Sequence, residues 1–416
     1  MSGTGWRVWS SFFTPVKIKA LRIYWSGQAC ALIGMWLQVT SMGILVYHLS
    51  HGSGTAVGLM AALNAAPFLF GGMLLGSLGD HFERRKLLIV VQIVQILVAS
   101  ALCILGWTGL LALWHLFAAT FILGIIQCIA FPTQQAFVGD LVPRDMLLKS
   151  ISMYSLVFNI CRSVGPPLGG FVIGTLGENL AFGINALCNI PMILCLITLG
   201  HGLVLTSNKE TTPARIAKRS SPGGLATVWG HYPLKMILLS AIIQNLFGQS
   251  MYQIVPALTY GSPSATASLL GAVGTGAVAS ILFVMPFAGR SSRIGLRLST
   301  GTLWMACMFI TAGIFPNIIL QTGCFFLAGL ATSALFVTTS STVQLLAPSH
   351  QKSTILGLFT IVTIGAQPLA ALWWGALLDQ IGVPALLILV GSVQAILSIL
   401  MLCQKRWITW SLSTNV

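Results

Sequence analysis

Long apolar runs that carry almost no charge constrain this chain more than any other feature. Only 7% of its 416 residues are charged and its mean hydropathy is +0.90, whereas charged residues make up about 25% of a typical soluble domain. A run of about 18 apolar residues or more is long enough to cross a bilayer as a helix. The sequence therefore predicts an all-α polytopic membrane protein and excludes a water-soluble fold.

The apolar runs number twelve and fall into two sets of six. The first set is Ile23–Leu49, Ala56–Leu78, Leu87–Trp107, Leu110–Val138, Ile151–Thr175 and Leu180–Leu205. The second set is Met236–Thr259, Ala267–Ala288, Ser299–Phe315, Ile318–Leu346, Ile355–Leu378 and Val383–Cys403. We expect 12 transmembrane helices in two six-helix halves, residues 1–205 and 234–416, joined by a cytoplasmic linker at 206–233. The first run is too long for the core of a signal peptide, so we expect it to be a retained helix.

Basic residues give the orientation of these helices. When both termini are placed in the cytoplasm, 20 of the 21 Lys and Arg residues fall in inside segments and the outside loops have none. This distribution follows the positive-inside rule. The net charge of +14 therefore reflects membrane orientation, and we expect no nucleic-acid partner. Arg162 is the one basic residue left within an apolar run.

The two sets of helices carry signs of an internal repeat. PLGGFVIGTLGE (167–178) aligns without a gap on PLAALWWGALLD (368–379), which places Glu178 opposite Asp379. Just upstream, FPTQQAFVGDLVP (131–143) lies on FVTTSSTVQLLAP (336–348). Parallel repeats of six helices describe one major transporter architecture, in which the substrate site lies near the membrane midplane between the halves.

The inside loop after the second run, GSLGDHFERRK (76–86), has two interpretations. Its basic residues alone support a loop that only fixes membrane orientation. Asp80, however, is an acid at the C-terminal end of a helix, where it is unfavourable unless it meets a cation or the positive N-terminus of another helix. A cytoplasmic gate that closes in one state, with Arg84 and Arg85 nearby, would supply such a partner.

Arg162 lies in NICRSVGPPLGG (159–170), about 12 residues into its helix, which is roughly 18 Å deep and near the midplane of the bilayer. An arginine there costs at least about 2.5–3.5 kcal/mol. Three roles account for it. Arg162 is a structural cation bonded to carbonyls or to Asn159, or it binds an anionic substrate group, or it pairs with an acid in one transport state.

The supply of acids limits the third role. Of seven acids, five lie in inside segments and none lies in the middle of a run. Glu178 and Asp379, at outer helix ends, are the remaining candidates for coupling.

Amide side chains inside the runs either line a cavity or join helices, since amides commonly pair between membrane helices. The candidates among them are Gln38, Asn64, Gln127, Gln244, Asn245, Gln249 and Gln367. Nine cysteines, all within apolar runs, show no CxxC or metal spacing. We therefore expect the cysteines to pack as small apolar residues, with no metal and no cofactor.

Two motifs resemble the major facilitator superfamily. GSLGDHFERRK is similar to its loop motif Gly-x-Leu-x-Asp-Arg-x-Gly-Arg-Arg, with His81 and Glu83 as departures. The branch that contains the enterobactin exporter and the bacterial macrolide efflux proteins often has an acid at the position of Glu83. The resemblance extends over 21–38, 131–147 and 162–170, whereas GRSSRIGLR (289–297) lacks the acid of the second copy. It implies that Asp80, Asp140, Arg84 and Arg85 form a cytoplasmic gate.

GPPLGG (165–170) resembles the helix-five motif of superfamily exporters, Gly-Pro-x-x-Gly-Gly. In that motif Gly165, Gly169 and Gly170 would let the halves pack closely, while Pro166 would give the helix a weak point. The resemblance implies a monomeric exporter in a bacterial cytoplasmic membrane, moving a siderophore or a macrolide-like drug by alternating access and driven by protons.

Rival functions remain at this stage. One rival is an importer of a small metabolite, and another is a membrane sensor or scaffold that transports nothing. An enzyme would need clustered His, Asp or Glu near one leaflet, which the sparse acids and scattered histidines do not provide.

Overall fold

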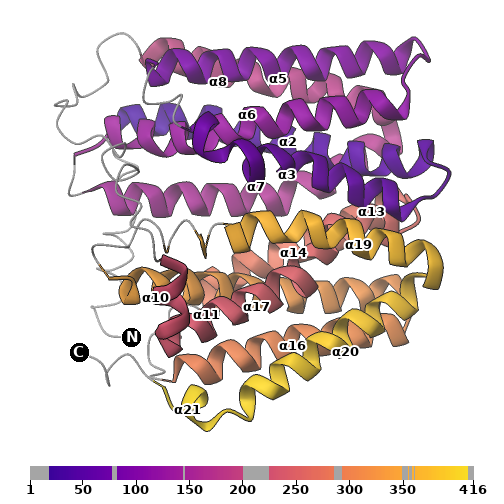
Figure 1. The fold of residues 1–416 in the computed structure, drawn as a ribbon. Helices are drawn as coiled ribbons and strands as arrows, with labels where there is room; N and C mark the ends of the chain where they lie inside the picture. Colours follow the sequence, from indigo (N-terminus) through magenta and orange to yellow (C-terminus); the bar gives the residue numbers. More distant parts are fainter. Residues whose placement is uncertain are drawn as a thin grey trace.

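In the computed structural model of the chain, the described residues are 18–76, 82–143, 146–199, 224–284, 293–348, 355, 358–359 and 361–410. They are almost entirely helical, and Figure 1 shows the long helices lying side by side. The predicted Asp80 lies outside the described residues, as does the side chain of Asn159.

The helices of the N-terminal part are long and mostly unbroken. They are α2 (Lys19–Leu49), α3 (Gly54–Gly76), α5 (Arg84–Trp107), α6 (Leu113–Asp140), α7 (Leu147–Leu176) and α8 (Glu178–Leu199). Those of the C-terminal part are more often interrupted. They are α10 (Gly224–Gly230), α11 (Tyr232–Ile243), η3 (Gln244–Gln249), α12 (Ser250–Gln253), α13 (Val255–Leu258), α14 (Pro263–Ala279), η4 (Ser280–Val284), α16 (Ile294–Ile314), α17 (Ile318–Leu346), η5 (Ile361–Gly365), α19 (Ala366–Ile381), α20 (Val383–Leu402) and α21 (Lys405–Ile408).

Nine helices in the described part are long and apolar enough to cross a membrane, and α3 adds a shorter apolar stretch, Gly54–Leu69. The prediction of an all-helical chain built from membrane-length helices is therefore confirmed. The count of twelve helices and the division at 206–233 stay predictions.

The run Met236–Thr259, expected as one helix, is divided into four pieces, α11, η3, α12 and α13. Pro256, near the start of α13, has no backbone N–H to donate, which explains the break there. Gly248 lies in the π-helical turn η3, where a Cβ atom would collide with the side chain of Met305. Hydrophobicity gave the length of this run but no sign of its breaks.

Six short connections between helices lie together at one end of the bundle, which we call the short-loop end. They are Ser50–Ser53, Thr108–Ala112, Gly177, Thr259–Ser262, Phe315–Asn317 and Gly382. Gly177 and Gly382 form one-residue turns with φ of 86° and 77°, a conformation that favours glycine. The opposite end, which carries Arg84–Lys86, Arg293 and Lys405, is called the basic end.

These turns correct the ungapped repeat alignment at its last residues. Glu178 follows its turn as the first residue of α8, whereas Asp379 precedes its turn inside α19. The two acids are therefore not structurally equivalent, because α19 continues for several residues beyond the point that matches the end of α7.

The N-terminal helices meet the C-terminal helices along two seams of small residues. In the first seam, α7 against α14, a Cβ at Gly170 would collide with Ala267, and a Cβ at Gly271 would lie 2.5 Å from Cγ of Pro167. In the second seam, α3 against α19, a Cβ at Gly58 would lie 2.5 Å from the Ala371 carbonyl oxygen. Small residues are what let membrane helices approach this closely.

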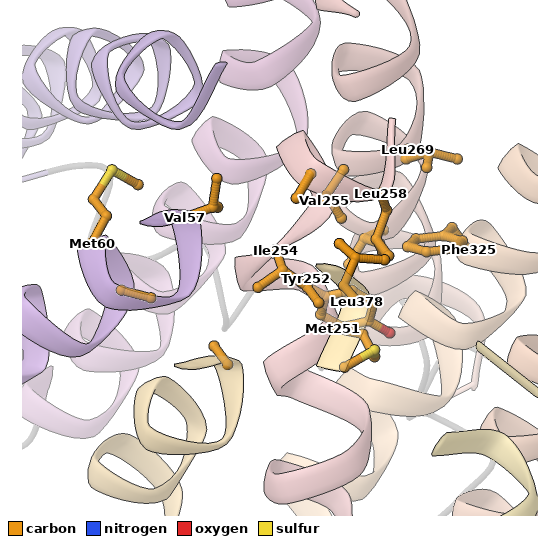
Figure 2. Close-up of a cluster of buried hydrophobic side chains, with 14 of the residues drawn as sticks. Val57, Met60, Met251, Tyr252, Ile254, Val255, Leu258, Leu269, Phe325 and Leu378 are labelled. Carbon is orange, nitrogen blue, oxygen red and sulfur yellow. The ribbon is translucent and has the colours of Figure 1, made fainter. Parts of the chain in front are cut away.

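A buried apolar cluster joins the same groups of helices. Figure 2 shows Val57 and Met60 of α3 on one side of the cluster. On the other side lie Tyr252 of α12, Leu258 of α13 and Ile254, which connects these two helices. Val57 and Ile254 are fully buried. The cluster belongs to the part of the bundle next to the short-loop end, because α3 begins there and α13 ends there.

Glycine substitutions on α7 provide a matched test of the first seam. Gly170→Ala places a methyl group against Ala267, so we expect a loss of about 1–3 kcal/mol and a lower melting temperature of the purified protein in detergent. Gly174, one turn further along α7, has no atom within 4 Å of its Cβ position. Gly174→Ala is therefore expected to be neutral, and equal melting temperatures for the two variants would contradict the seam.

Candidate functional site

Arg162 lies between the two groups of helices. Its guanidinium is 5.7 Å from the centroid of the Trp36 ring of α2, and its backbone carbonyl faces Gly274 of α14. It also interacts electrostatically with the hydroxyl of Tyr252. Within the described part of the chain, Arg162 forms no salt bridge and no hydrogen bond. The face-on contact with Trp36 is a cation–π interaction, which stabilises the cation only in part.

One face of α7 lies against α2. Gly165, one turn from Arg162, leaves room for the side chain of Trp36, and Gly169 contacts Leu37 and Thr40, all on α2. Arg162, Gly165 and Gly169 thus share the side of α7 that faces α2. The expectation that all three motif glycines join the halves is wrong, because only Gly170 faces α14.

Trp36 and Tyr252 were not among the residues that the sequence singled out. The indole nitrogen of Trp36 is buried and has no hydrogen-bond partner among the described residues. Tyr252 is buried, its hydroxyl lies 3.1 Å from Oγ1 of Thr332, and its ring packs against Phe309 and Phe325. No spacing in the sequence connects either aromatic residue with Arg162, because both contacts are between different helices.

Five of the predicted amide side chains join helices, and one of them, Gln244, does so through the Thr332 carbonyl of α17. Asn185 of α8 donates to Gln38 of α2, and the Gln127 amide lies 3.1 Å from Sδ of Met35. Gln367 of α19 donates to Oδ1 of Asn245 in η3 at 2.7 Å. Their hydrogen-bonding groups are therefore engaged in holding the bundle together.

Two predicted amides remain without such partners. The side chains of Asn64 on α3 and Gln249 on η3 form no hydrogen bond with any described residue. Asn64 is exposed and Gln249 is partly buried. With Arg162, they are the members of the predicted set that keep free hydrogen-bonding capacity.

The π-helical turn η3 is hydrogen-bonded to two other helices, α19 and α17. Trp374 of α19 donates to the Leu246 carbonyl at 2.7 Å, and Gln244 itself donates to the Thr332 carbonyl at 3.2 Å. π-Helical turns are rare and frequently occur at functional sites. Here the turn places Gln249 on a widened segment of the seventh run.

At the basic end, Arg84 and Asp140 form an ion pair. Nη1 of Arg84 lies 2.7 Å and 2.9 Å from the two carboxylate oxygens of Asp140, and both side chains are mostly buried. Arg85 and Lys86 instead lie 3.5 Å and 2.8 Å from Glu83. The hydrogen bond from Lys86 holds the pKa of Glu83 below its usual range. Arg84 and Asp140 lie on α5 and α6 of the same group of helices, so this pair alone does not connect the two groups.

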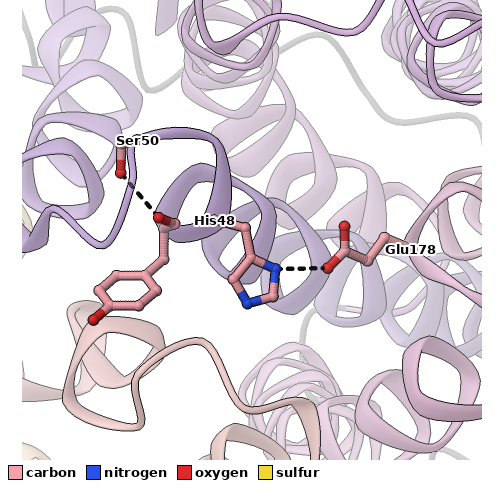
Figure 3. A network of polar contacts seen from close by, with 4 residues as sticks. His48, Ser50 and Glu178 are labelled. Carbon is pink, nitrogen blue, oxygen red and sulfur yellow. Dashed lines mark hydrogen bonds and ion pairs between the residues drawn. The ribbon is translucent and has the colours of Figure 1, made fainter.

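At the short-loop end, both predicted outer acids have partners. Glu178 lies 3.2 Å from Nδ1 of His48, as Figure 3 shows, and His48 also lies against Gly261. Asp379 accepts hydrogen bonds from the backbone and side chains at the start of α3. Neither acid contacts Arg162. Among the described residues, no cluster of metal-ligating side chains is present and all nine cysteines are free.

A family model described as transmembrane secretion effector matches residues 10–411. The chain belongs to this family of major facilitator transporters. It is a membrane transporter and not an enzyme, and it is a multi-pass protein whose substrates are small molecules.

Curated relatives of this family transporter are similar at low identity. The staphyloferrin A transporter of Staphylococcus aureus is 22% identical over 87% of this chain and 90% of its own length. The enterobactin exporter of Shigella flexneri is 23% identical over 86% and 85%. Macrolide efflux protein A of Streptococcus pyogenes is 27% identical over 41% of this chain and 42% of its own length.

Solved transporter structures share the fold. A peptide transporter in complex with sulfate aligns with a TM-score of 0.72 and 14% identity over 92% of this chain and 94% of its own. The nucleoside transporter NupG aligns with a TM-score of 0.71 and 11% identity over 92% and 98%. At these identities the likeness concerns the fold alone.

The two arginines at the start of α5 offer a test of the basic-end ion pair in the transporter. Arg84→Ala leaves a mostly buried Asp140 without its cation, so we expect a stability loss of about 1–3 kcal/mol, seen as a lower melting temperature in detergent. Arg85→Ala removes only a longer contact with the exposed Glu83 and should cost less than about 1 kcal/mol. A larger effect of Arg85→Ala would show that Asp140 is not the dominant partner.

Proposed function

We propose that this transporter is a secondary active exporter of a small amphipathic molecule, with a siderophore that carries an anionic group as the favoured substrate class and a macrolide-like drug as the alternative. The relatives support export, since they include an enterobactin exporter and a macrolide efflux protein. A siderophore is favoured because the interior of the bundle holds a cation that has no anionic partner among the described residues.

The proposed topology places the short-loop end outside the cell. Twelve helices then form two halves, 1–205 and 234–416, with the linker 206–233 and both termini in the cytoplasm of a bacterium. The basic residues support this orientation through the positive-inside rule. The exporter would act as a monomer in the inner membrane.

The proposed substrate class rests on the position of Arg162 and on its lack of a described anionic partner. A cation at this depth costs at least about 2.5–3.5 kcal/mol, and no described carboxylate offsets that cost. The buried indole N–H of Trp36 is a second donor without a partner among the described residues. It belongs to the same ring that the Arg162 guanidinium covers. Hydrogen-bond donors that have no acceptor in the protein are available to bind an anionic group of a substrate. Asn64 and Gln249, which are also unpaired, would supply neutral contacts.

Alternating access follows from the seams. Rocking of the two halves would separate the helices at one end and close them at the other, as in related transporter folds. The contacts at the short-loop end suit a state that loads substrate from the cytoplasm. Asp80, Arg84, Arg85 and Asp140 would form the gate at the basic end. In that assignment Arg84 and Asp140 hold one half together, while Asp80 meets the other half.

The proton gradient is the proposed driving force. No described acid lies in the middle of a helix, so a proton site would differ from the mid-membrane carboxylates used by many exporters. Glu178 and Asp379, the predicted coupling acids, both lie at the short-loop end. A pH gradient imposed on vesicles tests the driving force independently of which residue carries the proton.

Inverted membrane vesicles provide the test of export. Energised vesicles that contain the transporter should accumulate a labelled carboxylate siderophore, and an uncoupler should abolish the accumulation. Vesicles without the transporter are the control. Absence of accumulation with intact protein would refute the siderophore class, and the same vesicles then receive a labelled macrolide. Uptake by intact cells without efflux would instead favour the importer.

Substitution of Arg162 separates a substrate contact from a structural one. Arg162→Gln keeps hydrogen-bonding capacity but removes the charge, and we expect at least about a tenfold loss of transport at normal membrane abundance, as for a lost charged contact. Arg162→Lys keeps the charge and should retain part of the activity. Gln127→Leu, which removes the neutral contact between Gln127 and Met35 of α2, is the control for loss of a helix contact without loss of charge. Loss of protein with Arg162→Gln would indicate a structural role.

A further inference from the structure

Asp379 makes a contact that the proposed coupling role does not explain. Its carboxylate accepts four hydrogen bonds from the start of α3, although it belongs to α19 of the other group of helices. The backbone N–H groups of Gly54 and Thr55 donate at 2.5 Å and 2.9 Å, and the hydroxyls of Thr55 and Ser53 donate at 2.6 Å and 3.1 Å. No other described acid bonds across the two groups of helices.

The contact has the chemistry of a helix cap. The first N–H groups of a helix have no partner within it, and the positive end of the helix dipole attracts a negative charge. Ordinarily a residue of the same chain segment supplies that cap. In α3, Ser53 caps only the N–H of Ala56, at 3.2 Å, and the N–H groups of Gly54 and Thr55 depend on Asp379.

The backbones are close enough to make this cap specific. A Cβ at Gly54 would lie 2.8 Å from the Gly375 carbonyl oxygen, one helical turn before Asp379. A depression of about 280 Å³ above the contact is lined from both groups of helices and includes Ser53, Asp379 and Tyr260. Below the contact lies the apolar cluster of Figure 2, in which Val57 and Leu378 are buried. The short-loop end is therefore closed by a polar contact over an apolar cluster.

From this geometry we infer that Asp379 is the latch of the short-loop end, holding α19 to the N-terminus of α3, and is not a proton carrier. The inference rests on the alternating-access function proposed above. Opening of the short-loop end pulls α3 away from α19 and breaks all four hydrogen bonds. The strength of the latch thus helps to set the fraction of molecules that are open at this end.

Glu178 has a different role in this arrangement. It bonds to His48, and both residues belong to the N-terminal group of helices, so their contact survives the opening. His48 in turn lies against Gly261, which would place a Cβ 2.5 Å from Nε2 of the ring. Glu178 therefore positions the His48 ring, which packs against the C-terminal group of helices. Asp379 instead forms direct hydrogen bonds between the two groups.

A buried reporter residue measures the latch without any substrate. Val57→Cys places a thiol in the fully buried apolar cluster below Asp379. The protein is reconstituted in lipid nanodiscs, so that a water-soluble maleimide reaches both faces whatever the orientation in a cell. Labelling is measured by mass spectrometry of the peptide that contains residue 57, so that the reaction of native cysteines such as Cys403, at the end of α20, is not counted.

Asp379→Asn in this background removes the charge and keeps the shape. We expect labelling of residue 57 to become roughly threefold to tenfold faster, the range for loss of a charged but solvent-exposed hydrogen-bonded group. Gln380→Ala, at the exposed neighbouring position, should leave the rate unchanged. Thr55→Val removes one donor from the opposite side of the contact, and we expect a smaller increase in the same direction.

The outcomes separate the latch from the proposed function. Unchanged labelling in Asp379→Asn, in protein that elutes as a monodisperse peak, would overturn the latch whatever the transport activity. If Asp379→Asn does not yield folded protein, Thr55→Val decides, and an unchanged rate there overturns the latch. Faster labelling together with absence of siderophore transport by the parent protein would support the latch and refute only the substrate class.

Discussion

Close backbone contact between two groups of helices is the constraint on which the rest of this structure depends. A bilayer offers no water to satisfy exposed polar groups and no hydrophobic force to hold apolar helices together. Packing therefore has to come from surfaces that fit closely. Gly170 and Gly271 let α7 meet α14, and Gly58 lets α3 meet α19. Seams made of small residues are tight but carry few polar bonds, which suits two halves that move against each other.

The membrane environment also divides the polar residues into those with partners and those without. Polar groups inside a membrane tend to find partners, and Gln38, Asn245 and Gln367 have done so. Arg162 has the greatest need of a partner, yet among the described residues it has only the face of Trp36 and an electrostatic interaction with the Tyr252 hydroxyl. Residues whose polar groups are engaged serve the bundle, and those whose groups are free are available to a ligand. Hydrogen bonds between helices decide to which group a polar residue belongs, so residue type alone does not predict it.

Sequence reasoning predicted the features that depend on composition and local spacing, and it missed those that depend on contacts between helices. The membrane-length helices follow from apolar runs, and the common face of Arg162, Gly165 and Gly169 follows from helical spacing. The repeat alignment failed near Asp379, since the extra length of α19 leaves no mark in an ungapped match. Tyr252 was missed because its neighbours Thr332 and Arg162 are distant in sequence. A broken helix such as α11–α13 also reads as one apolar run.

The pair α3 and α19 shows how one contact can favour two alternating states. Because α3 begins and α19 ends at the short-loop end, the two helices run antiparallel, and the C-terminal end of each lies beside the N-terminal end of the other. An acid near a C-terminal end can then cap the partner helix, as Asp379 does for α3. By sequence, Asp80 follows the C-terminal end of α3, and the proposed gate at the basic end gives it a partner in the other half. A rocking motion that brings the helices together at one end separates them at the other, so the two caps would exclude each other. Two caps that exclude each other favour the two states in which one end is closed over an intermediate that is open at both ends. A transporter must avoid that intermediate because it would leak.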